Sequence, residues 1–295
     1  MLVDDGPVWL APHSAAGELF PAPTGELVRI AFLGSTAEVG SSSDQPSHQL
    51  SDTPGRLSRA IPLFLAEQVY FHGHAQVRPM VPWLKGETPS FVLARPPWET
   101  ASAAQYARSG QPPPDYVVVT HVIPAADLWK VQLRLVRTID AAVLGTAEAS
   151  FAIAQPETAL RELSGTLLKL LQKEASLDRV TPPPQYHPPS GPDFAYYLLR
   201  LEQLLAVRCS TMDGTPPQFL SGCREIIDGN LHLCVSQTNN VVPRLLLLQT
   251  LCSMKKVRPE VVDEYREKIL LLQKEKPLAE PAHSVLQRLI SEVYP

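Results

Sequence analysis

The sequence predicts an α+β or α/β domain followed by an all-helical array. Three observations support this fold class. Strand-like runs and helical stripes alternate over residues 1–178, which predicts a small mixed sheet with an antiparallel meander and covering helices. Residues 194–295 contain only helical periodicity, as in a helical-hairpin array. Between them, residues 179–193 hold six prolines and no apolar period, which is typical of a semi-rigid linker.

The first elements combine an irregular arm, a strand and a helix. Residues 1–26 are rich in Pro, Gly and Ala, and we expect them to form an arm lying on the first domain. Residues 27–33 are a short apolar run, which predicts a buried strand. After a long polar loop, Thr53-Pro54 predicts the start of a helix over residues 55–70. Thr is a good N-cap residue and Pro suits the first helical position.

The middle of the first domain carries the strongest strand signals. Residues 76–83 resemble a strand, but their two prolines predict a sheet edge or a bulged segment, because proline cannot donate to a ladder. An alanine-rich helix is expected over residues 99–108. A meander follows: residues 116–123 are rich in valine, and residues 129–135 and 143–151 alternate apolar and polar side chains. Pro156 then opens a helix whose leucine stripe is expected to cover the meander: Leu160, Leu163, Leu167, Leu168 and Leu171.

Beyond the linker, five helical stripes are expected. They begin near Phe194 and Phe219, cover residues 241–254 and 262–272, and end with residues 286–293. Residues 241–254 are apolar nearly all round, so this helix should be covered on more than one side.

Three segments carry a family resemblance: Asp115-Tyr116-Val117-Val118, Val131 to Arg137, and Asp140 to Gly145. With the preceding strand and helix, they make residues 27–175 resemble in pattern the amino-terminal domain of the TolB family, which has an anticodon-binding-like α/β fold. The chain departs from that family at Gly34-Ser35, where the family has Pro-Phe. The resemblance implies a small protein-docking module, sometimes joined to tetratricopeptide-like helices, with no catalytic residues to carry over.

Charge argues against a nucleic-acid partner. The formal net charge is −4; residues 1–178 hold 13 basic and 18 acidic side chains, and residues 179–295 hold 13 and 12. Neither part has the concentrated positive charge that neutralising phosphates requires.

Cysteine use and hydropathy predict a cytoplasmic protein without a membrane span. All four cysteines lie in the second half: Cys209, Cys223, Cys234 and Cys252. They form no C-x-x-C pair, so neither a zinc site nor a disulfide framework is supported. The amino terminus lacks the features of a secretory signal, and the longest apolar stretch, around Leu245–Leu248, is far shorter than a membrane span.

Three local patterns contain residue types found in active or metal sites. Gly34–Ser41 follows a strand as a phosphate loop would, but it lacks the lysine of that motif. His72 and His74 would need further ligands to bind a metal. Ser41–Ser43, with His48 and either Asp44 or Asp52, contain the residue types of a hydrolytic triad, but no nucleophile-elbow pattern surrounds the serines. An ordinary loop is favoured in each case, so we assign no catalytic residue, metal or cofactor.

The leading functional hypothesis is a non-enzymatic scaffold or adaptor that binds another protein. Trp98 is the candidate aromatic anchor, with packing within the domain as the alternative. Lys255, Lys256 and Arg258 are candidates for an acidic partner, or they complement the helix dipole. A second hypothesis is a small-ligand-binding module or enzyme that uses residues 34–55 at the end of a strand. A third is a structural subunit of a larger assembly.

Overall fold

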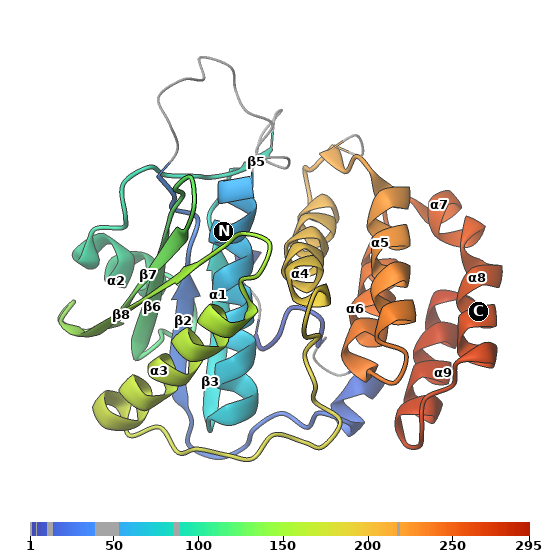
Figure 1. The fold of residues 1–295 in the computed structure, drawn as a ribbon, viewed down its shortest axis with the longest axis horizontal. Helices are drawn as coiled ribbons and strands as arrows, with labels where there is room; N and C mark the ends of the chain where they lie inside the picture. The colour runs from blue at the N-terminus through green and yellow to red at the C-terminus, as the bar shows by residue number, and fades with distance from the viewer. Residues whose placement is uncertain (1, 4, 11–13, 39–52, 85–88, 217–218) are drawn as a thin grey trace. The chain divides into compact units, whose positions relative to one another are not determined.

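The chain forms two compact units (Figure 1). This computed structural model describes residues 2–3, 5–10, 14–38, 53–84, 89–216 and 219–295. The α/β unit comprises Met1–Pro7, Pro23–Leu84 and Ser90–Pro182, and the helical unit comprises Val8–Ala22, Lys85–Pro89 and Pro183–Pro295. The division between Pro182 and Pro183 falls within the expected linker.

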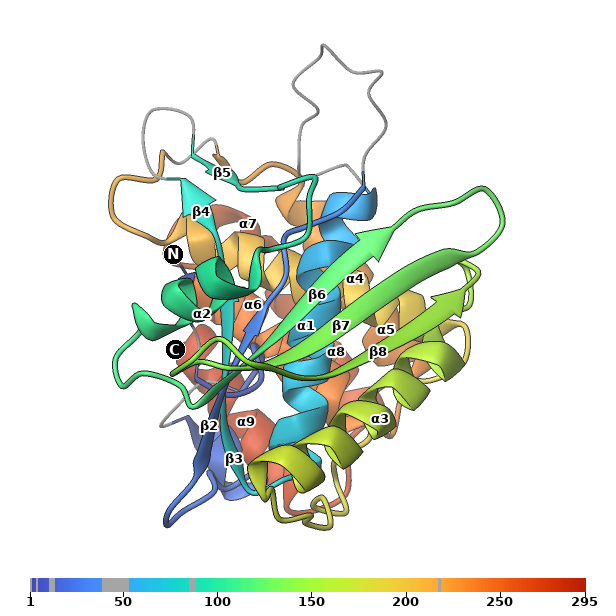
Figure 2. The ribbon, with the colours of Figure 1, turned by 90° about the vertical axis from the view of Figure 1, so that its left-hand side faces the viewer.

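A six-stranded mixed sheet organises the α/β unit (Figure 2). Its strand order is β1-β3-β2-β6-β7-β8. The strands are β1 Leu2–Val3, β2 Val28–Leu33, β3 Ala75–Val81, β6 Tyr116–Ile123, β7 Trp129–Arg137 and β8 Val143–Phe151. β2 runs parallel to β3 and β6, whereas β6, β7 and β8 form the expected antiparallel meander. The predicted mixed sheet is therefore confirmed. A separate antiparallel pair joins β4 (Trp83–Leu84) to β5 (Ser90–Phe91).

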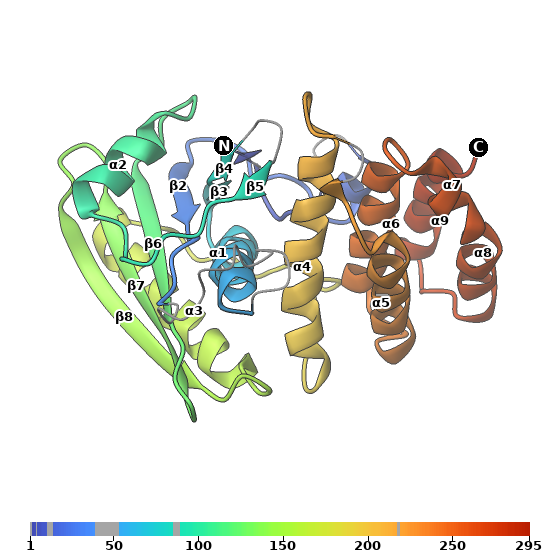
Figure 3. The same ribbon diagram turned by 90° about the horizontal axis from the view of Figure 1, so that it is seen from above.

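Helices cover both faces of this sheet. Figure 3 shows α1 (Thr53–His72) and α3 (Glu157–Ala175) on one side and α2 (Thr100–Arg108) on the other. The predicted leucine stripe of α3 is buried, as is a small-residue cluster under α2 that includes Ala31, Leu33 and Val119. Two buried faces explain why apolar side chains predominate in β2 and β6.

Pro62 lies inside α1 and has a specific role there. A proline has no backbone N–H, so the carbonyl of Ser58, one turn earlier, keeps no helical partner from residue 62. The backbone N–H of Ser35 donates to that carbonyl at 3.0 Å. Gly34 allows this close approach, because a Cβ there would lie 2.1 Å from the Ser58 oxygen. The helix is thereby tied to the end of β2.

The structure corrects the expected position of residues 76–83. β3 is not the edge strand, because the two-residue β1 lies outside it. The backbone carbonyl of Val77 accepts a hydrogen bond from the backbone N–H of Gly6, on the β1 side of β3. The backbone nitrogen of Pro79, two residues later, faces the same side. The β1 ladder reaches only Met80 and Val81. Pro79 therefore interrupts no strand ladder among the described residues, and its place beside β2 is tolerated.

The helical unit is built around a central helix. Its helices are α4 Asp193–Ser210, α5 Cys223–Ser236, α6 Val241–Met254, α7 Pro259–Glu264, α8 Arg266–Glu275 and α9 Ala282–Val293. α6 packs against α4, α5 and α9 and is buried on nearly every side. The expected coverage of residues 241–254 is confirmed. The stripe at residues 262–272 forms two helices instead of one, because the chain turns at Tyr265.

The amino-terminal arm also differs from expectation. Residues Val8–Ala22 belong to the helical unit and contain a short 3-10 helix, η1 (Ala15–Glu18), that contacts α9. The Trp9 indole donates to the Tyr197 hydroxyl at 3.0 Å, and its ring meets Phe20 edge to face. Both aromatic rings are almost fully buried. Burial of these two large aromatic side chains in the core of the helical unit holds the arm in that unit.

Candidate protein-binding surfaces

The described part of the loop after β2 continues the sheet. Thr36 and Ala37 form parallel bridges with Ala94 and Val122. The backbone N–H groups of Ala37 and Glu38 donate to carbonyls of neighbouring strands. A phosphate cradle needs such groups unpaired and pointing at the ligand. The rest of this candidate region, residues 39–52, lies outside the described residues, together with the serines, His48 and the aspartates of the triad-like pattern.

A buried polar cluster lies at the ends of β2 and β6. The Thr36 hydroxyl donates to the Thr120 carbonyl at 3.0 Å, and His121 Nδ1 lies 3.0 Å from that hydroxyl. His121 Nε2 is 4.0 Å from the Glu38 carboxylate. Burial lowers the pKa of His121; Glu38 raises it and Arg134 lowers it again, so the pKa lies below its ordinary value. The hydroxyls of Ser35 and Thr120 are buried without a hydrogen-bond partner among the described residues.

Trp98 packs within the α/β unit. Its indole N–H donates to the Gly34 carbonyl at 2.9 Å, and its ring lies 5.3 Å from that of Tyr106. Arg134 donates to the Trp98 carbonyl and to the Thr100 hydroxyl. The half-buried ring therefore joins α2 to the end of β2. A role for Trp98 in partner binding stays a prediction.

The three candidate cations after α6 are separated by the structure. Lys255 donates to the Val293 carbonyl, and its ammonium lies 5.5 Å from the Tyr294 ring centroid. Lys255 thus links the end of α6 to the end of α9. Lys256 is exposed. Arg258 lines an open cleft of about 410 Å³ near the starts of α5 and α7. Arg224 also lines this cleft, and its guanidinium is paired with Glu264 at 2.6 Å.

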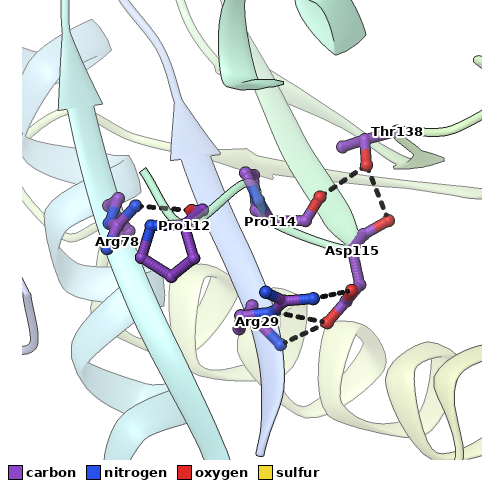
Figure 4. Close-up of polar contacts among 6 residues, drawn as sticks. All are labelled: Arg29, Arg78, Pro112, Pro114, Asp115 and Thr138. Carbon is purple, nitrogen blue, oxygen red and sulfur yellow. Dashed lines mark hydrogen bonds and ion pairs between the residues drawn. The ribbon is translucent and has the colours of Figure 1, made fainter. Parts of the chain in front are cut away.

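Sequence reasoning missed a polar clasp at the starts of β2 and β6 (Figure 4). Asp115 accepts hydrogen bonds from the backbone N–H and guanidinium of Arg29, at 2.9 and 2.8 Å. Burial alone would raise the pKa of Asp115, but the bonds from Arg29 outweigh it and the pKa lies below its ordinary value. The Thr138 hydroxyl reaches the Pro114 carbonyl, and Arg78 donates to Pro112. Arg29 and Asp115 are 86 residues apart, so no local pattern could reveal their pairing.

β8 forms an open edge of the sheet. It pairs with β7 along its length and with no other strand that the structure describes. Its inner face rests on α3: a Cβ at Gly145 would lie 2.8 Å from a Leu170 methyl group. Thr146, Glu148 and Ser150 are exposed on the other face, as the alternation predicts. Sequence analysis identified this strand and its two faces but not its unpaired edge.

The surroundings of the β8 edge expose apolar side chains. Ile139 in the β7–β8 turn is 77% exposed, and Val143 at the start of β8 is 47% exposed. At the other end, Leu128 is 55% and Ile153 is 42% exposed. An open groove of about 360 Å³ also runs along β7 and β8, lined by Gln132, Leu133, Arg134, Thr146, Ala147 and Glu148. We call β8 and these four apolar side chains the β8 surface.

Known proteins add no assignment to this geometry. No protein-family model matches the chain, and no curated protein matches it in sequence. Within the described ranges, no helix has both the length and the apolar character needed to cross a membrane.

Proposed function

We propose that this chain is a non-enzymatic scaffold or adaptor whose α/β unit binds an extended protein segment at the β8 surface. The observation that carries the proposal is a nine-residue edge strand that pairs with no described strand on its outer side and has exposed apolar side chains at both ends. An added strand would pair with the backbone N–H and C=O groups on that side of β8, and the flanking side chains would contribute specificity.

The composition of β8 supports this role. Protein sheets commonly protect long edges with lysines, prolines or very short strands. β8 contains no lysine or proline, and its one charged residue is Glu148. The Glu148 carboxylate already lies 3.3 Å from the Lys130 ammonium on β7. An incoming strand therefore meets little electrostatic or steric opposition.

The proposal also includes the family resemblance and the cellular compartment expected from the sequence. The element order of the α/β unit is compatible with the TolB-like resemblance, and we keep a docking module joined to tetratricopeptide-like helices as part of the proposal. All four cysteines are free thiols, which suits the reducing cytoplasm. The third possibility, a subunit of a larger assembly, would use the same edge.

Affinity capture with edge variants tests this function. The full chain and the double variant Val143→Lys/Ser150→Lys would be immobilised and exposed to lysate from the source organism. We expect a specific partner to bind the wild type and be lost from the variant, because lysines block edge pairing. The matched control, Thr166→Lys/Gln172→Lys, places the same charges at exposed positions of α3. A partner retained equally by all three proteins contradicts the proposal.

A second candidate function is supported by the buried hydroxyls of Ser35 and Thr120. They lie toward the carboxyl ends of the parallel strands β2 and β6, the edge at which open α/β sheets often bind ligands. A small polar ligand would give these hydroxyls a partner. Thermal-shift screening against small polar compounds should then reveal a stabilising compound whose effect disappears in Thr120→Val. Equal shifts in both proteins would rule out this site.

A further inference from the structure

We propose that the segment bound at the β8 surface is β8 of a second copy of this chain, paired antiparallel about a two-fold axis at Ala147. The inference rests on the proposed function, because it names the occupant of the same edge. About a two-fold axis, both copies use the same surface. Each side chain must therefore be compatible with the side chain that lies opposite it in the other copy. The sequence of β8 and its surroundings meet that requirement in two independent ways.

The first argument is the register of the strand itself. With Ala147 opposite Ala147, Thr146 of each copy faces Glu148 of the other, a pair that can form a hydrogen bond. Gly145 then faces Ala149, and Val143 faces Phe151. Like charges directly opposite one another destabilise a pair of strands. The one charge in β8 is two positions from its own symmetry mate, so this register avoids that cost.

The second argument is the distribution of exposed apolar side chains. Ile139 and Val143 lie at one end of β8, and Leu128 and Ile153 lie at the other. Antiparallel pairing brings the first end of each copy beside the second end of the other. All four side chains are then placed near apolar side chains at both ends of the shared sheet. A foreign strand would have to supply this complementarity separately.

Cysteine cross-linking tests the axis. Residues directly opposite in an antiparallel pair have Cα atoms about 4.5–5.5 Å apart, which a disulfide can span. Under mild oxidation, Ala147→Cys should therefore give a covalent dimer at the axis. Ser150→Cys is the matched control, because its two copies would lie roughly 20 Å apart along the strands. Wild type, with its four native thiols, measures the background. Equal cross-linking of both variants, or none, overturns the proposed axis.

A charge pair at residue 146 tests the register in the uncrosslinked protein. Thr146→Glu places two like-charge pairs across the axis, and Thr146→Lys places two opposite-charge pairs in the same positions. By sedimentation equilibrium we expect Thr146→Glu to weaken dimerisation by about 2- to 30-fold. Thr146→Lys should leave it unchanged or strengthen it. Thr146 is exposed in the single chain, so both variants should fold, which circular dichroism would check.

The outcomes separate this inference from the proposed function. Opposite effects of the two variants support self-pairing. Equal weakening by both overturns this register. A chain that stays monomeric at every concentration, yet captures another protein through β8, overturns self-pairing and retains the proposed function. A chain that dimerises without cross-linking at residue 147 and is unaffected by Val143→Lys/Ser150→Lys overturns self-pairing. If that variant also retains every captured partner, the proposed function is overturned as well.

Discussion

The two edges of the sheet differ sharply in how they end. At one edge, β1 contributes two residues, Gly6 adds one bond to Val77, and the buried Arg78 reaches back to Asp5 at 2.9 Å. At the other edge, β8 contributes nine residues with no further strand beside it among those described. A very short edge strand is a common protection against unwanted pairing. The sheet is therefore protected at the β1 edge and open at the β8 edge. This difference makes β8 the edge at which to test for binding of another strand.

The largest expected effect tests how β8 is held. Leu167 is fully buried in α3, the helix that covers the inner face of the meander. Leu167→Ala should lower the free energy of unfolding by about 2–5 kcal/mol, through lost burial and a cavity. Hydrogen exchange should rise first at β8, because α3 and β7 make its main contacts among the described residues, and later at β3. The exposed Lys169→Ala is the control; equal effects of both would contradict this account.

A second prediction compares glycines at the centre and the edge of the sheet. Gly34→Ala places a methyl group 2.1 Å from a backbone oxygen of α1, which cannot move without the helix. Gly145→Ala meets only the end of the Leu170 side chain, at 2.8 Å. We expect Gly34→Ala to cost about 2–3 kcal/mol by chemical denaturation and Gly145→Ala less than about 1 kcal/mol. A reversed order would show that the edge is packed as rigidly as the centre.

A third prediction compares one charged contact at each edge. Arg78 is buried and bonds both Asp5 and the Pro112 carbonyl, so Arg78→Ala should cost about 1–3 kcal/mol. Glu148 pairs with Lys130 in solvent at 3.3 Å, so Glu148→Ala should cost less than about 1 kcal/mol. Both would be measured by urea unfolding at a concentration where the chain is monomeric. Similar costs at the two edges would remove the distinction drawn between them.

The smallest expected effect on stability concerns the ion pair of Arg29 and Asp115, which lies between the two edges of the sheet. The folded-state pKa of Asp115 lies below its ordinary 3.8, so its stabilising contribution is present above that pH and is lost as the pH falls through the folded-state pKa. Because the carboxylate is 40% exposed, Asp115→Asn should cost less than about 1 kcal/mol at pH 7. The difference between the two proteins should shrink below about pH 4. A difference that is unchanged with pH would show that Arg29 does not stabilise the charged form.

Local periodicity predicted the elements that depend on one buried face. The strands at residues 116–123 and 143–151 have the predicted bounds, and the leucine stripe of α3 is buried as expected. The all-round apolar character of residues 241–254 correctly indicated a central helix. In each case the spacing of apolar side chains shows which face of the element is apolar. Burial of that face then decides whether the segment forms a helix or a strand.

Contacts between distant segments were beyond such patterns. The clasp of Arg29 with Asp115 and the contact of Trp9 with Tyr197 join residues 86 and 188 positions apart. Trp98 offered a plausible exposed anchor in sequence, but its indole meets Gly34 and its ring meets Tyr106. Among the predicted partner-binding cations, Arg258 lines an open cleft, whereas Lys255 is bonded to the end of α9. Thr36 and His121 of the buried polar cluster also come from distant parts of the chain, so the spacing of residues in the sequence could not predict their contact.

Hydrophobic spacing along the chain was sufficient to predict the mixed α/β and all-helical parts, the meander and the central helix, because it specifies an element and its buried face. The neighbours of each strand became known from the folded structure alone. Pro79 in β3 looked like an edge marker, yet the edges are β1 and β8. Strand neighbours are chosen by backbone hydrogen bonds between segments far apart in the chain, and every residue except proline offers the same backbone groups. Side-chain spacing along the chain therefore does not specify which strand lies at the edge of the sheet.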